Sequence, residues 1–248
     1  MKTLAANRIN WAFSRTDLMA LLGALIVLVV LSVHSGDISW RGYSDRIACV
    51  NNLRHIGVSF RTYAADHAGR YPMQISTNQG GSYEFMPPSA LAASSIWRHY
   101  RPMSNELVFP TPLVCPTDAR TMATSWALTA ATAGAGKIPF NMNQNISYFV
   151  GLDAMEIFPE MLLGGDRNVT NNTPSVIDVF RTGATAQIGF LGMNWANTNV
   201  GPGWNNRLHQ YAGNIVLGDG SVRRINASEL KAQLKISGDS SNRVAVPN

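Results

Sequence analysis

The sequence has little charge and little cysteine, and it lacks the common signatures of catalysis. Only 14% of its 248 residues are charged, and the basic residues are scattered instead of forming the stripe or patch that nucleic-acid binding needs. Neither a Cys-x-x-Cys nor a His-x-x-x-His motif is present, so no structural zinc site of common spacing is predicted. No Gly-x-Ser-x-Gly, His-Glu-x-x-His or phosphate-binding loop occurs either. These absences argue against nucleic acid as a partner and leave no catalytic residue to assign.

One long apolar run, from Leu18 to Val33, is the strongest signal in the sequence. Its sixteen uncharged residues would form roughly 24 Å of helix, slightly less than a ~30 Å hydrocarbon core. Lys2, Arg8 and Arg15 precede the run, and by the positive-inside rule they keep the N-terminus in the cytoplasm. We expect the membrane anchor to be formed by Leu18, Leu21, Leu22, Ile26, Val27, Leu28, Val29, Val30 and Leu31.

A second helical segment is predicted after the apolar run. Ser35-Gly36-Asp37 interrupts the pattern with Asp37 as a candidate N-cap, and a signal peptide cleaved near this point is the alternative to a retained anchor. One face of an amphipathic helix is then marked by Trp40, Tyr43, Ile47, Val50, Leu53, Ile56, Phe60 and Tyr63. We therefore expect a basic cytoplasmic leader over residues 1–17, a transmembrane helix over 18–34, an amphipathic helix over 35–69 and an exported loop-rich domain over 70–248.

The stretch CVNNLRHIGVSFRTYAADHAGRYP, from Cys49 to Pro72, resembles the signature that follows the membrane helix in bacterial type II secretion pseudopilins of the major, G-like kind. Three further blocks follow in order: VCPTD from Val114, NISYFVGLDA from Asn145 and LLGGDRN from Leu162. A prepilin-like branch of that family carries a C-terminal motif of His, nine residues and Asp-Gly, which is matched by His209, Asp219 and Gly220. The resemblance implies an α+β, type IV pilin-like fold, in which a long N-terminal helix lies half in the membrane and half on a small antiparallel sheet.

The residues themselves agree with a sheet in the exported part. Ser147–Val150 and Ala186–Leu191 are short strand-like runs. NIVLG-DG-SVRRI predicts two strands joined by a type I′ turn, which explains Asp219 and Gly220 without any chemistry. His209 is either a hydrogen-bonded structural residue, which we favour, or an acid/base group or metal ligand.

Two polar segments are candidate binding sites. GGDRNVTNN contains Asp166, a weak candidate for binding calcium, but a single carboxylate is few for that ion and a plain polar loop is favoured. Trp195 and Trp204 lie in an Asn-rich segment predicted to be a loop, where they would either stack on a sugar or anchor the loop by burial. No other cofactor is expected.

The two cysteines, Cys49 and Cys115, form one possible internal pair. Because export would place them in an oxidising compartment, we expect a disulfide between them. The alternative is two buried free thiols.

Two positions depart from the family's processing pattern. Aligned on the apolar run, Arg15 stands where those precursors carry a Gly before the cleavage point, Thr16 would start the mature chain, and Ala20 replaces a Glu inside the helix. We therefore expect the leader to be kept.

The resemblance, taken with the anchor, implies a structural subunit of a type II secretion or type IV pilus-like system, minor or divergent, and not an enzyme. It would lie in the bacterial inner membrane as a single-pass protein, with its C-terminal domain in the periplasm or on the cell surface. Its partners would be the membrane, other pilin-like subunits and the secretion or pilus assembly machinery. The alternative is an exported carbohydrate-binding module or envelope enzyme built on a pilin-like scaffold.

Overall fold

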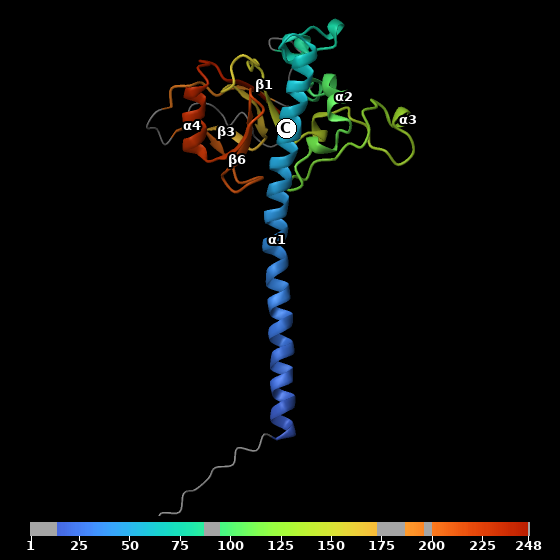
Figure 1. The fold of residues 1–248 in the computed structure, drawn as a ribbon, viewed down its shortest axis with the longest axis vertical. Coiled ribbons are helices and arrows are strands. Elements are labelled where there is room, and N and C mark those ends of the chain that lie inside the picture. The colour runs from blue at the N-terminus through green and yellow to red at the C-terminus, as the bar shows by residue number, and fades with distance from the viewer. Residues whose placement is uncertain (1–13, 87–94, 173–186, 196–199, 248) are drawn as a thin grey trace, which may run out of the picture. The chain divides into compact units, whose positions relative to one another are not determined.

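The chain is α+β: an N-terminal apolar helix is followed by further helices and a six-stranded antiparallel sheet (Figure 1). The computed structural model describes residues 14–86, 95–172, 187–195 and 200–247. Most of the predicted leader, residues 1–13, therefore lies outside the described part. Within the chain, residues 1–44 and 45–248 form two separate compact units.

Helix α1 (Arg15–Asp66) begins in the first unit, and its residues from Asp45 onward belong to the second. Its segment Arg15–Ser32 is long and apolar enough to cross a membrane. The nine residues predicted to form the anchor each expose at least 50% of their surface. This length, composition and exposure fit a single membrane anchor or a signal sequence.

Helix α1 has no break where one was predicted. Its backbone is helical from Arg15 to Asp66, so the predicted interruption at Ser35-Gly36-Asp37 and the N-cap at Asp37 are wrong. Ser and Gly each lower helix propensity by about 1 kcal/mol or less, whereas extending an existing helix is cooperative. Good helix-forming sequence on both sides therefore carries the helix through these residues. The helix ends at Asp66, three residues before the predicted end at 69, and Gly69 follows with a left-handed φ of 73°.

The second unit is built on a sheet whose strand order is β4-β8-β1-β2-β6-β7, with every neighbouring pair antiparallel. The expected strands near residues 147–150 and 186–191 are present as β1 and β4. The bounds of the six strands are β1 Tyr148–Gly151, β2 Leu162–Asp166, β4 Gln187–Phe190, β6 Gly213–Leu217, β7 Val222–Ile225 and β8 Arg243–Val246.

Alternate residues of the central strands pack against two different helices. On one face, Tyr148, Val150, Leu163, Val216 and Ala245 belong to a core that includes Leu53, Ile56 and Phe60 of α1. On the other face lie Phe149, Leu162, Ile215, Leu217, Val244 and Val246, in a core that includes Leu230 and Leu234 of α4 (Ala227–Ile236). Figure 1 shows the strands between these two helices. The central strands are therefore buried on both faces, whereas the edge strand β7 exposes Arg223 and Arg224.

Helix α4 was not predicted, although the sequence carries a signal for it. Asn226 is its N-cap, and the Asn226 side chain accepts hydrogen bonds from the backbone N–H groups of Ser228 and Glu229. The Glu229 carboxylate in turn accepts a hydrogen bond from the backbone N–H of Asn226, at 2.7 Å. This reciprocal pair is a capping box, which marks where a helix begins.

The remaining elements are short. A separate two-stranded antiparallel sheet pairs β3 (Val169–Asn172) with β5 (Gly201–Trp204). The segment predicted as an Asn-rich loop therefore contains a strand, β5. The short helical turns are η1 Pro72–Gln74, η2 Thr77–Gln79, η3 Tyr83–Phe85, η4 Ile96–His99, η5 Arg101–Met103, α2 Ser104–Leu107, η6 Thr111–Leu113, α3 Ala130–Ala133 and η7 Asn143–Asn145.

The predicted Asp-Gly hairpin is present, but its turn is of another type. Strands β6 and β7 pair directly, and the backbone N–H of Leu217 donates to the carbonyl of Ser221 at 3.0 Å. The loop thus has three residues, Gly218, Asp219 and Gly220, of which Gly220 adopts a left-handed φ of 81°. Asp219 does not have positive φ, so the type I′ assignment is wrong. A three-residue loop that ends in a left-handed glycine is the next most common hairpin connection.

Replacing Gly220 with valine is expected to lower the free energy of unfolding by about 2 kcal/mol, because a β-branched residue resists this backbone conformation. Gly220→Asn is the matched control, since asparagine tolerates the left-handed region. Urea unfolding of both variants measures the difference. Equal stability of the valine and asparagine variants would contradict the turn geometry.

Candidate functional site

The predicted disulfide is present and lies at the centre of a buried polar cluster. Cys49 of α1 is bonded to Cys115, which follows η6. The Cα atoms are 5.1 Å apart across a sequence separation of 66 residues, and neither cysteine is exposed to solvent. The bond therefore ties the second half of α1 to the loop-rich region of the same unit.

His209 contacts this disulfide. It lies in the connection between β5 and β6, and only 2% of its surface is exposed. Its Nε2 atom is 3.6 Å from Cys115 Sγ and 3.4 Å from Asp166 Oδ2. Three features that the sequence suggested separately, the disulfide, the motif histidine and the calcium candidate Asp166, are thus brought together.

Asp166 reaches the cluster from the end of β2. It is fully buried, and its Oδ2 atom accepts hydrogen bonds from the backbone N–H and the side-chain amide of Asn214, at 2.7 and 2.8 Å. Asn214 lies on the neighbouring strand β6. Because two paired strands hold this carboxylate, its position relative to His209 is fixed by the sheet itself.

The β5–β6 connection that carries His209 is fixed by hydrogen bonds before and after the histidine. The Asn168 side-chain amide donates to the carbonyls of Asn205 and Ala212, at 3.1 and 3.0 Å. Directly after His209, Gln210 and Tyr211 have left-handed φ values of 53° and 61°. Such conformations cost about 1–2 kcal/mol for residues other than glycine, so the surrounding structure must impose them.

Burial shifts the pKa values of both ionisable side chains toward their uncharged forms. It raises the pKa of Asp166 to about 7, although the hydrogen bonds from Asn214 act in the opposite direction. It lowers the pKa of His209 to about 4, with a smaller contribution from the positive charges of Arg46 and Arg224. The pair therefore lies in surroundings that disfavour a charge on either partner.

The cluster also holds polar atoms without a partner. His209 Nδ1, Asp166 Oδ1 and Asn214 Oδ1 are buried and make no hydrogen bond within the described part of the chain. Buried polar groups in folded proteins are nearly always satisfied, by protein, water or an ion. These three atoms are therefore available to bind a water molecule or an ion.

The surroundings of Asp166 do not resemble a calcium loop. The segment predicted to be a polar loop forms the end of β2, a turn and β3. The side-chain contacts of Asp166 are the N–H groups of Asn214 and the imidazole of His209. Calcium requires six to eight oxygen ligands, so Asp166 is not favoured as a calcium ligand.

The two halves of the predicted motif have separate partners. The side chain of Asp219 accepts a hydrogen bond from the backbone N–H of Ser221 at 2.8 Å, and its carbonyl accepts one from Arg61 at 3.0 Å. His209, in contrast, contacts Asp166 and Cys115. The Asp-Gly pair therefore shapes the hairpin turn, whereas His209 belongs to the buried cluster.

The two tryptophans do not form a sugar platform. Trp204 is 4% exposed and belongs to the core between the sheet and α4, against which the ring of Trp195 also packs. Trp195 Nε1 donates a hydrogen bond to the carbonyl of Leu191. The alternative expectation, that they are buried anchors, fits Trp204 fully and Trp195 in part.

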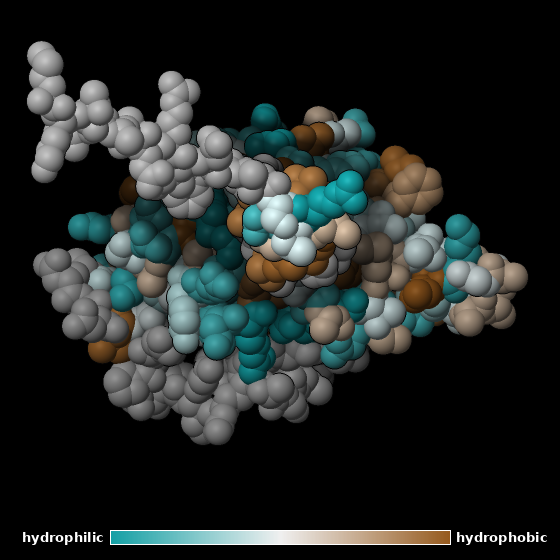
Figure 2. All heavy atoms as spheres, turned by 90° about the horizontal axis from the view of Figure 1, so that it is seen from below, coloured by the Kyte–Doolittle hydropathy of each residue, from teal (hydrophilic) through white to brown (hydrophobic). Residues whose placement is uncertain are grey.

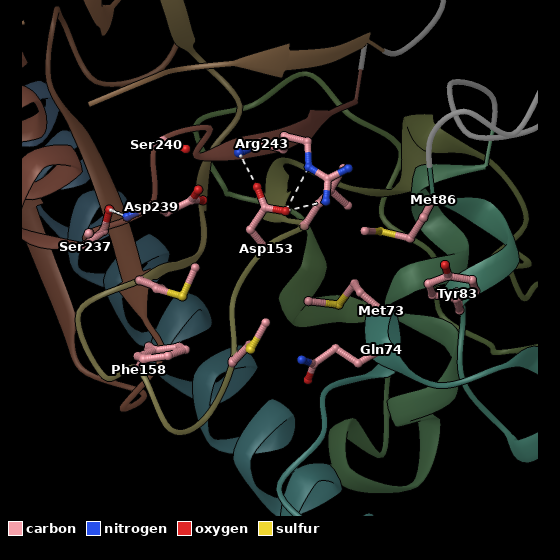
Figure 3. A pocket seen from close by; sticks show the side chains of 14 residues that line it. Met73, Gln74, Tyr83, Met86, Asp153, Phe158, Ser237, Asp239, Ser240 and Arg243 are labelled. Carbon is pink, nitrogen blue, oxygen red and sulfur yellow. Dashed lines mark hydrogen bonds and ion pairs between the residues drawn. The ribbon is translucent and has the colours of Figure 1, made fainter. Parts of the chain in front are cut away.

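A cavity of about 740 Å³ lies elsewhere in the second unit and was not predicted. Figure 3 shows Asp153 and Arg243 paired on one side of it, with Met73, Met86 and Phe158 around the rest of the wall. Arg243 Nε donates to Asp153 Oδ1 at 2.8 Å. The cavity wall thus combines polar and apolar side chains. The outer surface does so too, since Figure 2 shows hydrophobic and hydrophilic residues interspersed over one face of the described molecule.

Comparisons with protein-family models, with curated proteins and with solved structures find no match for this chain.

Proposed function

We propose that this protein is a membrane-anchored, pilin-like structural subunit of a type II secretion or type IV pilus-like system. One observation carries the proposal. A single helix, α1, contains both a segment able to cross a membrane and a segment whose apolar residues pack on an antiparallel sheet. This is the arrangement that the resemblance around Cys49–Pro72 implies, and the disulfide adds to it by fastening α1 to the exported domain.

The burial of the polar cluster supports a structural role for His209. An acid/base catalyst must reach its substrate, whereas His209 and Asp166 expose 2% and 0% of their surface. The same enclosure lets the cluster join α1, the end of β2 and the β5–β6 connection. We therefore propose no reaction for this site.

Subunits of such a system would contact one another through their apolar helices, so a thiol placed there tests the proposal. With Leu28 replaced by cysteine, treatment of native membranes with a thiol cross-linker is expected to give covalent dimers. The parent is the matched control: Cys49 and Cys115 are bonded to each other, so it should stay monomeric. Gel electrophoresis with an antibody to the protein reads out the result. Only monomer in the Leu28→Cys membranes would contradict assembly through this helix.

A further inference from the structure

We propose that Cys49, Cys115 and His209 form a zinc site when the disulfide is reduced. One ligand atom from each of these side chains lies within 4.8 Å of the others, and all three residues are buried. Sequence spacing gave no sign of such a site, because its members come from α1, from the loop after η6 and from the β5–β6 connection. The fold brings together residues that are separated by 66 and 94 positions.

The existing distances are close to those that zinc requires. Zinc binds thiolate sulfur at about 2.3 Å and imidazole nitrogen at about 2.0–2.1 Å, so two ligand atoms on one tetrahedral ion lie about 3.5–3.8 Å apart. Cys115 Sγ and His209 Nε2 are already separated by 3.6 Å. The main adjustment is a rotation that moves the two sulfur atoms apart once they are no longer bonded.

A candidate fourth ligand, Asp166, contacts His209, one of the three. Asp166 Oδ2 is 3.4 Å from His209 Nε2, and Asp166 Oδ1 is buried and makes no hydrogen bond to any described residue. Carboxylate oxygen is an ordinary zinc ligand. The two hydrogen bonds from Asn214 would orient the carboxylate from behind, as outer-shell partners do in metal sites.

The reaction needs a reductant and releases protons. A small dithiol supplies two electrons and two protons to the Cys49–Cys115 bond, giving two thiols and the cyclic disulfide of the reductant. Zinc then binds the two thiolates, and the two thiol protons pass to solvent. The oxidised protein, in which both sulfurs are bonded to each other, has no thiolate to offer. The same cysteines would therefore hold α1 in place by a disulfide or by a metal ion, but never by both.

Metal titration of the full-length protein in detergent tests this site. The protein is reduced with dithiothreitol, desalted under nitrogen and titrated with Co²⁺, then with Zn²⁺. We expect one equivalent of cobalt to produce thiolate charge-transfer and tetrahedral d–d absorption, and one equivalent of zinc to remove it. Zinc should also raise the Tm of the reduced protein by about 5 °C or more. The oxidised parent should show neither effect.

Two histidine variants separate the site from chance binding by thiols. His209→Gln is expected to weaken cobalt binding at least about tenfold and to lose the tetrahedral spectrum. His55→Ala, which changes an exposed histidine of α1, should bind like the parent. Thermal melting of each oxidised variant first establishes that it folds, and Cys115→Ser supplies a second test if His209→Gln does not. Less than one equivalent bound by the reduced parent, or parent-like binding by a folded His209→Gln or Cys115→Ser protein, would overturn the proposal.

Discussion

Replacing Cys115 with serine is expected to lower the Tm of the oxidised protein by roughly 8–16 °C. The bond to Cys49 closes a loop across a sequence separation of 66 residues, and the chain-entropy model assigns about 4 kcal/mol to a loop of that size. For a domain of this size, each kcal/mol corresponds to roughly 2–4 °C. Because both sulfurs are buried, the new hydroxyl would also lie in an enclosed site beside His209.

Circular dichroism melts with a chelator present measure this shift, because the chelator prevents stabilisation by metal. Cys49→Ser should give the same decrease, and the double variant should be no less stable than either single variant, since all three lose one and the same bond. The matched control is the parent protein with its disulfide reduced by a dithiol, because it loses the loop closure without gaining a buried hydroxyl. Single variants that melt within about 2 °C of the oxidised parent would show that the disulfide contributes little.

Asp166 and His209 are expected to give opposite pH dependences once they are separated. In the parent, Asp166 has a raised pKa of about 7 and His209 a lowered one of about 4. Between those values the folded pair binds one proton, on Asp166. In the unfolded state the two groups also bind one proton between their ordinary pKa values of 3.8 and 6.5, and that proton is on His209. The two slopes of stability against pH therefore cancel in the parent from about pH 4 to 6.5.

Removing either partner exposes the slope of the other. In Asp166→Asn the remaining histidine has a lowered folded pKa, so the unfolded state binds more protons and stability is lost as the pH falls from 6.5 toward 4. In His209→Gln the remaining carboxyl has a raised folded pKa. Its contribution is greatest below its ordinary pKa of 3.8 and is lost as the pH rises to about 7. Each slope approaches about 1.4 kcal/mol per pH unit.

Urea unfolding at pH 4.5 and pH 6.5 measures both slopes, with the parent subtracted so that other groups cancel. Relative to the parent, Asp166→Asn should be more stable at the higher pH and His209→Gln more stable at the lower one, each by roughly 2 kcal/mol. If both variants keep the pH dependence of the parent to within about 0.5 kcal/mol, the two groups do not carry these shifted pKa values in the folded protein.

Local signals predicted much of the fold. The apolar run at Leu18 and the Asp-Gly hairpin each depend on neighbouring residues, and each is present. The predicted apolar face of α1 is buried from Leu53 to Tyr63, whereas its earlier members Tyr43 and Ile47 are exposed. The break at Gly36 was wrong because one weak residue does not end a helix that both flanks support. Helix α4 was overlooked even though its capping box is a local signal.

The buried cluster depends on contacts that no local pattern encodes. His209 meets Cys115 across 94 positions, and Asp166 meets Asn214 across 48, because strand order places β2 beside β6. The available clue was indirect: Asp166 and Asn214 are polar residues at the ends of otherwise apolar runs, LLGG and IVL. A polar residue in a fully buried strand needs a partner, but the sequence does not say which.

The position of β8 in the sheet has a consequence for the order of folding. Among the described strands, β4 pairs only with β8, and β8 lies between β4 and β1. Residues 187–190 therefore have no place in this sheet until residues 243–246 have joined it, although they come earlier in the chain. The four strands β1, β2, β6 and β7 need no such wait. A chain that emerges N-terminus first would thus complete its sheet from the middle outward, with an early strand docking last.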